Sequence, residues 1–344
     1  MLYLLAPFAY IGTIFGDNES IIKIPLLLAD LAILFFLVKI FPHKKQKLIL
    51  FYFLNPIIIY SIYIHSQLDI IPTALLFGSV YFLLLDKIKI SSIFFGLALS
   101  TKFHVIIALP LVLFYLYKKQ KSIKVVEYIA ISFFILLLLD LPFLFSEGFL
   151  NMVLLNPKQT LLFDTFYSIG TLKILLPIAA ILMVYLHFFN QNKVNQDLLF
   201  FYFGLLFTAT VFFIYPAPAW YVWMIPFLSI YFIQNQNQKK SILLYGAFSL
   251  AYLIFFIFFY KSEYKDIIFL GNNIDLKIDV EKLRNLFFTI LEATLLALLY
   301  AFYKYGIKSN SIYKKQTNLS IGIGGDSGVG KSTLVKNLKD ILGD

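Results

Sequence analysis

The sequence predicts an all-α polytopic membrane protein that carries the beginning of an α/β phosphate-binding domain at its C-terminal end. Hydrophobic residues make up 60% of the 344-residue chain, charged residues only 14%, and the mean hydropathy is +0.83. A soluble core of this length cannot bury all of the 39 Phe and 23 Tyr side chains. The string GDSGVGKS near the C-terminal end is typical of a phosphate-binding loop.

Charge and cysteine content narrow the classes of function. The net charge of +10 comes almost entirely from lysine, because Arg284 is the only arginine. The lysines lie between apolar segments, as membrane topology signals do. The sequence lacks the clustered basic residues with arginines that are typical of nucleic-acid binding. The absence of cysteine excludes disulfides and thiolate metal sites.

Apolar segments long enough to cross a membrane as helices, about 17–25 residues each, recur along the chain. They predict single spans near 21–41, 48–64, 68–85, 125–145, 169–189, 197–214, 219–233, 241–260 and 285–303. A further apolar region, 90–117, is too long for one crossing and is interrupted by STKFH. We expect it to form two short crossings or a re-entrant turn that breaks around Lys102, because a lysine inside a membrane needs a polar cavity or a partner. The chain then has about ten or eleven helices in all.

Lysine placement predicts the orientation of these helices. The basic connections, expected in the cytoplasm, are 43–47, 86–89, 118–124, 234–240 and 303–315. The lysine-poor connections, expected outside, are 65–67, 146–166 and 215–219, and alternation adds 261–283. The two sides alternate once 90–117 counts as two crossings. The C-terminal end is therefore expected in the cytoplasm, with a bacterial inner membrane as the location.

The C-terminal loop matches the pattern G-x-x-x-x-G-K-[ST]. The string LSIGIGG predicts a strand at 319–324, and KSTLVKNLKDILG predicts a helix at 331–341. In such a loop the backbone N–H groups cradle the phosphates of ATP, Lys331 reaches the β- and γ-phosphates, and Ser332 binds Mg²⁺. The residues expected to contact the nucleotide are Gly325, Asp326, Ser327, Gly328, Val329, Gly330, Lys331, Ser332 and Thr333.

The string IGIGGDSGVGKSTL resembles the start of the uridine kinase and phosphoribulokinase family, over this C-terminal stretch alone. That family continues with further βα units, an acidic Mg²⁺ partner and a lid, and none of these follows Asp344. We therefore expect a truncated and inactive kinase-like domain at 318–344, because a single βα unit cannot bury its own strand. A polar, flexible linker at 306–317 is expected to join it to a membrane domain at 1–305.

Four motifs of polar, small and aromatic residues lie near the ends of the expected spans. They are IIKIPLLLAD, NPIIIYSIYIHSQLD, GLALSTK and PAWYVWMIP. Their key residues are Lys23, Pro25, Asp30, Asn55, Pro56, Ser66, Gln67, Asp69, Gly96, Leu97, Ala98, Lys102, Trp220, Trp223 and Pro226. In this order they resemble the motifs of polytopic GT-C glycosyltransferases, with Ser66 in the place of a usual glycine.

The resemblance covers roughly residues 1–260 and implies transfer of a mannose-like hexose from a polyprenyl-phosphate donor to a glycan or lipid acceptor. Such a reaction needs a carboxylate to act as a base on the acceptor hydroxyl, and cations or aromatic rings beside the phosphate. Asp69 is the expected base, and His65, Gln67, Lys102, Trp220 and Trp223 are the expected substrate-binding residues. A divalent metal at the transferase site is an option that the resemblance leaves open.

Purely structural interpretations of the same residues stay open. His65, Gln67 and Asp69 fit a polar turn between helices, and Lys102 could have a structural partner such as Asp140. The two tryptophans fit an ordinary aromatic belt at the membrane interface.

The N-terminal stretch departs from the family pattern, which has an acidic residue in an outer loop after an initial helix. MLYLLAPFAYIGTIFGDNES has no basic start and so is not a signal peptide. Pro7 and Gly12 interrupt it, and we expect an interfacial helix that follows a missing first helix and catalytic loop. Within the chain, Asp17 and Glu19 are the alternatives for the catalytic acid.

Two other classes of function remain as alternatives. One is a transporter or flippase that uses the phosphate loop as an ATPase, although the sequence shows no obvious internal repeat. The other is a membrane-anchored nucleoside kinase, although an anchor needs only one or two spans.

Overall fold

A computed structural model describes residues 2–119, 121–156, 159–235, 238–260, 268–269, 272–273, 276, 278–316, 322–326 and 328–342. Helices dominate, and η marks 3-10 or π-helical turns. The N-terminal half contains α1 (Leu2–Phe15), α2 (Asn18–Ile21), α3 (Ile24–Ile40), α4 (Lys45–Leu48), η1 (Ile49–Phe53), α5 (Pro56–Ile58), η2 (Ile59–Ile64), α6 (Ile70–Leu84), α7 (Ile88–Thr101), η3 (Phe103–Ala108), α8 (Leu109–Lys118), α9 (Ser122–Asp140), η4 (Leu141–Phe143), α10 (Glu147–Phe149) and η5 (Leu150–Leu154).

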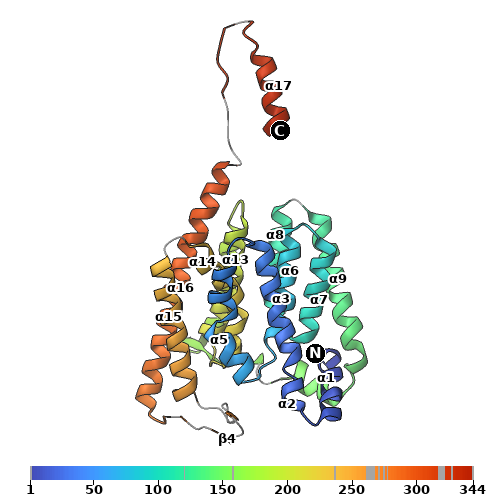
Figure 1. The fold of residues 1–344 in the computed structure, drawn as a ribbon, viewed down its shortest axis with the longest axis vertical. Helices are drawn as coiled ribbons and strands as arrows, with labels where there is room; N and C mark the ends of the chain where they lie inside the picture. Colours follow the sequence, from blue (N-terminus) through green and yellow to red (C-terminus); the bar gives the residue numbers. More distant parts are fainter. Residues whose placement is uncertain are drawn as a thin grey trace.

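The C-terminal half follows with α11 (Leu161–Asp164), α12 (Leu176–Phe189), α13 (Gln196–Phe212), η7 (Pro218–Trp223), α14 (Ile225–Gln234), α15 (Gln238–Ile254), η8 (Phe255–Phe259), α16 (Glu281–Gln316) and α17 (Lys331–Leu342). Two short antiparallel hairpins join β1 (Phe166–Ile169) to β2 (Leu172–Leu175) and β3 (Ile268–Phe269) to β4 (Asn272–Asn273). The long helices form one bundle, with α1, α2 and β4 at one end and the C-terminal end of α16 at the other (Figure 1).

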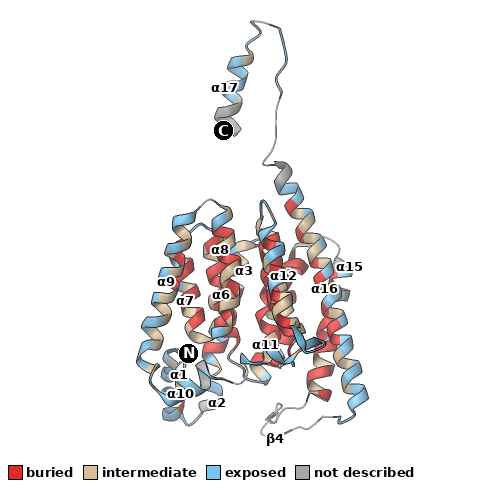
Figure 2. Cartoon of the chain, turned by 180° about the vertical axis from the view of Figure 1, so that it is seen from behind, coloured by how far each residue is buried: buried red, intermediate tan, exposed pale blue. Residues whose placement is uncertain are grey.

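Several helices have the length and composition of membrane spans. Four described helical stretches are long and apolar enough, namely Lys45–Ile64, Ser122–Phe143, Lys239–Phe259 and Glu281–Tyr313, and shorter apolar helices accompany them. Figure 2 shows exposed residues along the outer helices, such as α9. On α9 the exposed residues include the apolar Ile123, Val126 and Phe134. Such faces are suited to contact with lipid, and the all-α membrane architecture expected from the sequence is confirmed in this coarse form.

The predicted break in the region 90–117 is confirmed. Helix α7 ends at Thr101, Lys102 is extended with φ −158° and ψ 119°, and η3 and α8 lead back through the bundle. Another interruption follows from Asn55 and Pro56. Pro56 has no N–H with which to continue the preceding helix. After this break the Asn55 side chain caps a new helix, because it accepts a hydrogen bond from the N–H of Ile57 at 2.9 Å.

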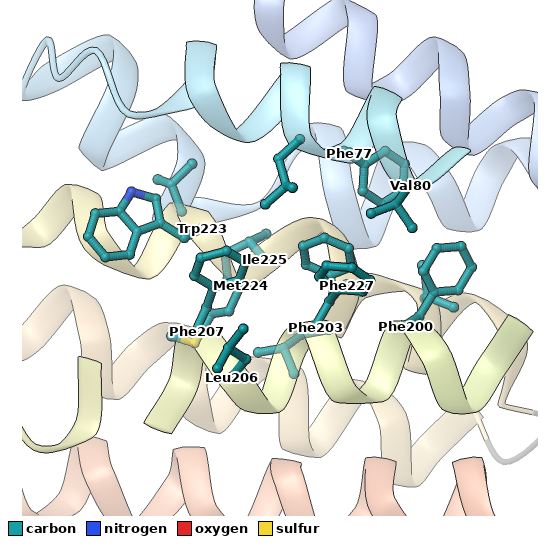
Figure 3. Packing of buried hydrophobic residues seen from close by; sticks show 14 of the residues in the cluster. Phe77, Val80, Phe200, Phe203, Leu206, Phe207, Trp223, Met224, Ile225 and Phe227 are labelled. Atoms are coloured by element: carbon teal, nitrogen blue, oxygen red, sulfur yellow. The ribbon is translucent and has the colours of Figure 1, made fainter. Parts of the chain in front are cut away.

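The core is packed from aromatic side chains of α6, α13 and α14. Figure 3 shows Phe77 and Val80 of α6 facing Phe227 of α14, with Phe200 and Phe203 of α13 on the other side. The rings of Phe203 and Phe227 stack at 5.3 Å between centroids, and those of Phe77 and Phe227 lie 5.4 Å apart. This layer fixes η7, which directly precedes α14, against the rest of the bundle.

Three local predictions are wrong. The span expected at 169–189 begins only at Leu176, because the preceding residues pair in the β1–β2 hairpin. Residues 306–316, expected as a flexible linker, continue α16 as helix. The strand expected at 319–324 is not formed at 322–324, and its first three residues lie outside the described part of the chain.

Candidate functional site

The first wall of the site is the turn between η2 and α6. Ser66 has φ +55°, in the left-handed region that favours glycine, which explains why the related motif usually has glycine there. The N–H of Gln67 bonds back to the carbonyl oxygen of Ser61 at 3.1 Å. This tight turn places Asp69 immediately before the first residue of α6.

Asp69 accepts two donors on the same carboxylate oxygen. The ammonium of Lys102 pairs with Asp69 Oδ1, and the Trp223 Nε1–H donates to the same atom at 2.7 Å. The Asp69 side chain is only 4% exposed, whereas that of Lys102 is 37% exposed. Lys102 Nζ also lies 5.3 Å from the ring centroid of Trp223. The pairing partner of Lys102 is therefore Asp69, not Asp140 as the alternative interpretation expected.

Two cavities meet at Lys102. We call the first the apolar cavity; it has a volume of about 660 Å³ and lies among α1, α7, α9, α10 and η5. Its wall consists mainly of Tyr3, Leu4, Leu97, Leu136, Leu137, Phe143, Leu144 and Phe149, with Asp140 among its few polar residues. The second, the aromatic cavity, has a volume of about 850 Å³. Its wall includes His65, Gln67, His104, Asn156, Gln159, Thr210, Trp220, Trp223 and Tyr260. Thr101, Lys102, Phe103 and Val153 line both.

The structure brings most of the predicted transferase residues together. His65, Gln67, Lys102, Trp220 and Trp223 all line the aromatic cavity. Trp223 is only 5% exposed and stacks on Trp220 at 5.7 Å between ring centroids, with an interplanar angle of 25°. An interfacial aromatic belt would leave such a ring at the surface, so that interpretation does not fit Trp223.

Asp69, the expected base, does not line either cavity. It lies behind Lys102 and Trp223. Its geometry is that of a carboxylate that holds two neighbouring side chains in place. The sequence-based role of Asp69 as the catalytic base stays a prediction.

Of the two N-terminal acids, Asp17 is separate from these cavities. The Asp17 carboxylate accepts a hydrogen bond from the backbone N–H of Ser20 at 3.0 Å and so caps the short helix α2. This bond lowers the pKa of Asp17 below its usual value. Asp17 lines neither cavity, and Glu19 lies in α2 with its side chain outside what the structure describes.

His104 is a residue of the cavity wall that the sequence analysis missed, as are Asn156, Gln159, Thr210 and Tyr260. His104 stacks on Trp223 at 3.7 Å between ring centroids, with an interplanar angle of 18°. It lines the aromatic cavity, and its Nδ1 is buried without a hydrogen-bond partner among the residues that the structure describes. The available signal was the string TKFH, in which His104 follows the intramembrane Lys102 by two residues.

Buried carboxylates hold the elements that carry the site. Asp30 of α3 accepts hydrogen bonds from Tyr52 at 2.8 Å and from Tyr63 at 2.7 Å, which fixes the chain on both sides of the Asn55–Pro56 break. Glu292 of α16 accepts one from Tyr221 at 2.8 Å, and Tyr221 lies in η7 between the two tryptophans of the wall.

The C-terminal loop has part of its expected form. Gly328 and Gly330 have φ +87° and +81°, and α17 begins directly after them at Lys331. The Lys331 ammonium bonds to the carbonyl oxygens of Gly325 and, at 3.0 Å, Asp326. Ser332 and Thr333 lie in the first turn of α17, whereas Ser327 lies outside the described residues.

Metal ligation of either site stays an expectation from the sequence. Among the residues that the structure describes, no three His, Asp or Glu side chains lie together as a metal site would require. The predicted role of Ser332 as a Mg²⁺ ligand rests on its place in the motif, directly after Lys331.

Comparison with known proteins gives one match. Residues 21–153 match the family model described as ALG3 protein, which is less than half of the chain. This stretch contains Asp69, Lys102 and His104, and it gives no support to a kinase domain at the C-terminal end. No curated protein and no solved structure matches the chain. The match and the apolar helices together support an integral, multi-pass membrane protein.

Proposed function

We propose that this protein is a membrane glycosyltransferase that moves a mannose-like hexose from a polyprenyl-phosphate donor to a hydroxyl of a glycan or lipid acceptor. The ALG3 family match suggests a membrane mannosyltransferase with a lipid-linked sugar donor. The proposal extends that suggestion to the particular residues that would bind the donor.

The observation that carries the proposal is that Lys102 borders both cavities. A lipid-linked sugar phosphate has an apolar chain, an anionic phosphate and a polar sugar in that order. The apolar cavity, the Lys102 ammonium and the aromatic cavity occur in the same order. Mostly apolar pockets with a few placed polar groups are the usual form of small-molecule sites.

Lys102 is the cation that would meet the phosphate. An ammonium has three N–H donors, and Asp69 occupies one of them, so the other two can turn toward a ligand. In the reaction the bond between the anomeric carbon and the phosphate oxygen breaks, and the acceptor oxygen bonds to the anomeric carbon while its proton passes to a base. The departing phosphate gains negative charge, which a fixed cation stabilises.

We assign Asp69 to positioning in this reaction. Its single shared oxygen fixes both Lys102 and Trp223, and its side chain is 4% exposed. Asp69 does not reach the cavity wall. To take the proton of an acceptor hydroxyl, it would first have to release these partners.

The test is sugar transfer by the purified chain in lipid. Hexose linked to a short polyprenyl phosphate is offered beside the same hexose linked to a nucleotide. We expect transfer only from the polyprenyl phosphate, with a loss on the order of a hundredfold in Lys102→Met, as for removal of one transition-state donor. Lys87→Met is the control, since Lys87 is exposed in the turn before α7. Transfer from the nucleotide sugar, or full activity of Lys102→Met, would contradict the proposal.

We also propose that residues 325–333 form the phosphate loop of a cytoplasmic, uridine-kinase-like nucleotide-binding domain. The support is the motif itself, the positive φ of Gly328 and Gly330, and the start of α17 at Lys331. Because the described residues 322–326 and 328–342 form a loop and one helix, which supply contacts to phosphates alone, we expect the 344-residue chain to bind Mg·ATP more weakly than micromolar, which corresponds to about −8 kcal/mol. Calorimetric titration measures this affinity for Mg·ATP, with Lys331→Ala as the control. Micromolar affinity that is lost in Lys331→Ala would contradict the expectation and show that the chain already holds a complete nucleotide site.

A further inference from the structure

His104 is a half-buried residue of the aromatic cavity wall with a buried Nδ1, and the proposed reaction so far has no use for it. Its ring lies flat on Trp223 at 3.7 Å, and Trp223 is itself fixed by its hydrogen bond to Asp69. Lys102, the other residue held by Asp69, precedes His104 by two positions and shares the same cavity wall. One carboxylate oxygen thus fixes a cation directly and an imidazole through the indole on which it stacks.

The surroundings of Nδ1 indicate which ring nitrogen carries the proton. Nδ1 is buried and has no hydrogen-bond partner among the described residues. A buried N–H without an acceptor is rarer and costlier than a buried lone pair without a donor. The neutral tautomer that follows has a bare Nδ1 and a proton on Nε2.

The same geometry limits how the ring can meet a ligand. Since Nδ1 is enclosed and the residue lines the aromatic cavity, the ring can reach a ligand only through Nε2. A neutral Nε2–H is a hydrogen-bond donor and has no lone pair with which to act as a base.

We propose that His104 is a second phosphate-binding residue, which donates through Nε2–H to a non-bridging oxygen of the lipid phosphate beside Lys102. This rests on the proposed function. A lipid-linked sugar phosphate is a diester with one negative charge, and the released lipid phosphate carries a second. Lys102 balances the first charge, and the His104 donor binds the oxygen on which the second develops.

Three variants separate the properties of the side chain. His104→Gln retains an N–H donor at about the distance of Nε2 but loses the ring. His104→Phe retains a ring to stack on Trp223 but has no donor. His104→Met has neither and serves if the Phe variant does not fold, and thermal unfolding of each variant in detergent reports folding.

The measurement is the Kd of citronellyl phosphate, with citronellol as the control that lacks the phosphate, together with kcat and KM for hexose transfer. A hydrogen bond to an anion predicts that His104→Phe weakens citronellyl phosphate binding on the order of tenfold to a hundredfold. We expect His104→Gln to bind nearly as well as the wild type and citronellol binding to be unchanged. We also expect kcat to fall more than KM rises in His104→Phe, because the bond strengthens as charge develops.

Each other outcome has a defined meaning. If Lys102→Met loses citronellyl phosphate binding while a folded His104→Phe does not, the His104 inference is overturned and the proposed function stands. If His104→Gln is as impaired as His104→Phe, the imidazole acts as something other than a donor, and the inference fails. If neither Lys102→Met nor His104→Phe changes the binding of citronellyl phosphate relative to citronellol, the proposed function fails as well.

Discussion

Asp69 Oδ1 is the atom on which the candidate site converges. It accepts from Lys102 and Trp223, and through Trp223 it also determines where His104 lies. Replacing a buried carboxylate alone lowers the stability of the protein, because its charged partner, here Lys102, then lacks a counter-charge.

This pairing gives the first prediction. Asp69→Asn leaves Lys102 without a counter-charge, and we expect it to lower the free energy of unfolding by about 1–3 kcal/mol, less than for a fully buried pair because Lys102 is partly exposed. The double variant Asp69→Asn/Lys102→Met should recover most of that stability and have no transferase activity. Denaturation in detergent and the transfer assay measure both. Full activity in the single Asp69→Asn variant would contradict the positioning role.

The second prediction concerns Ser66, whose φ of +55° is unfavourable for a side chain with a Cβ atom. We expect Ser66→Gly to raise the free energy of unfolding by up to about 1 kcal/mol, and Ser66→Val to lower it by about 1–3 kcal/mol. Thermal unfolding in detergent measures both. Ser311→Gly is the control, since Ser311 is helical and exposed in α16 and its replacement should destabilise. A stabilising Ser66→Val would refute the strained turn.

Among the helices, the contact of α7 with α9 depends on Gly96. A Cβ atom added there would lie 2.6 Å from the Ser132 carbonyl oxygen and 2.8 Å from Ile135 Cβ. Helix α7 ends one residue before Lys102, so its position decides where the two cavities meet. The glycine of the GLALSTK motif is thereby explained by packing.

Gly96→Ala is therefore the third prediction. The backbone carbonyl of Ser132 cannot rotate away, and we expect a loss of about 1–3 kcal/mol in the free energy of unfolding, as for other overpacked sites. Gly246→Ala in α15 is the matched control. Among the described residues, nothing lies within 4 Å of the Cβ that it would gain, so the change should be neutral or stabilising. Equal effects of the two substitutions would show that α7 and α9 are less closely packed than described.

The element boundaries show what the sequence could and could not predict. Hydropathy predicted an all-α membrane protein, and the cost of an unpaired lysine in an apolar run correctly placed the break at Lys102. The helical continuation of α16 was missed because its support is tertiary. Asn310 is only 2% exposed; it accepts from the N–H of Asn195 at 2.8 Å and donates to the Lys193 carbonyl oxygen at 2.9 Å. Such polar contacts with the turn before α13 have no periodic signature.

Five residues that the sequence singled out as substrate-binding residues lie along one cavity, and their role stays a prediction. They are His65, Gln67, Lys102, Trp220 and Trp223, each from a motif at the end of a span. The sequence could not reveal that Lys102 would pair with Asp69 and cover it, because that contact joins residues from separate motifs. His104 escaped notice because a lone histidine in an apolar segment is usually a packed core residue.

For the whole molecule, the expected topology is a separate prediction. The chain has no cysteine, so single cysteines can be introduced cleanly at Lys119, after α8, and at Asn156, after η5. We expect labelling by a membrane-impermeant maleimide from outside the cell only at position 156, because the basic turn that contains Lys119 is expected in the cytoplasm. Labelling of both positions from the same side would contradict this topology.

The central claim is that Lys102 holds a lipid phosphate between the two cavities. The most direct measurement is an experimental structure of the protein in lipid with a bound hexose-linked polyprenyl phosphate. The account predicts the phosphate within hydrogen-bond distance of Lys102 Nζ, the isoprenoid chain in the apolar cavity and the hexose against Trp220 in the aromatic cavity. A phosphate bound away from Lys102, or an isoprenoid chain that leaves the apolar cavity empty, would contradict it.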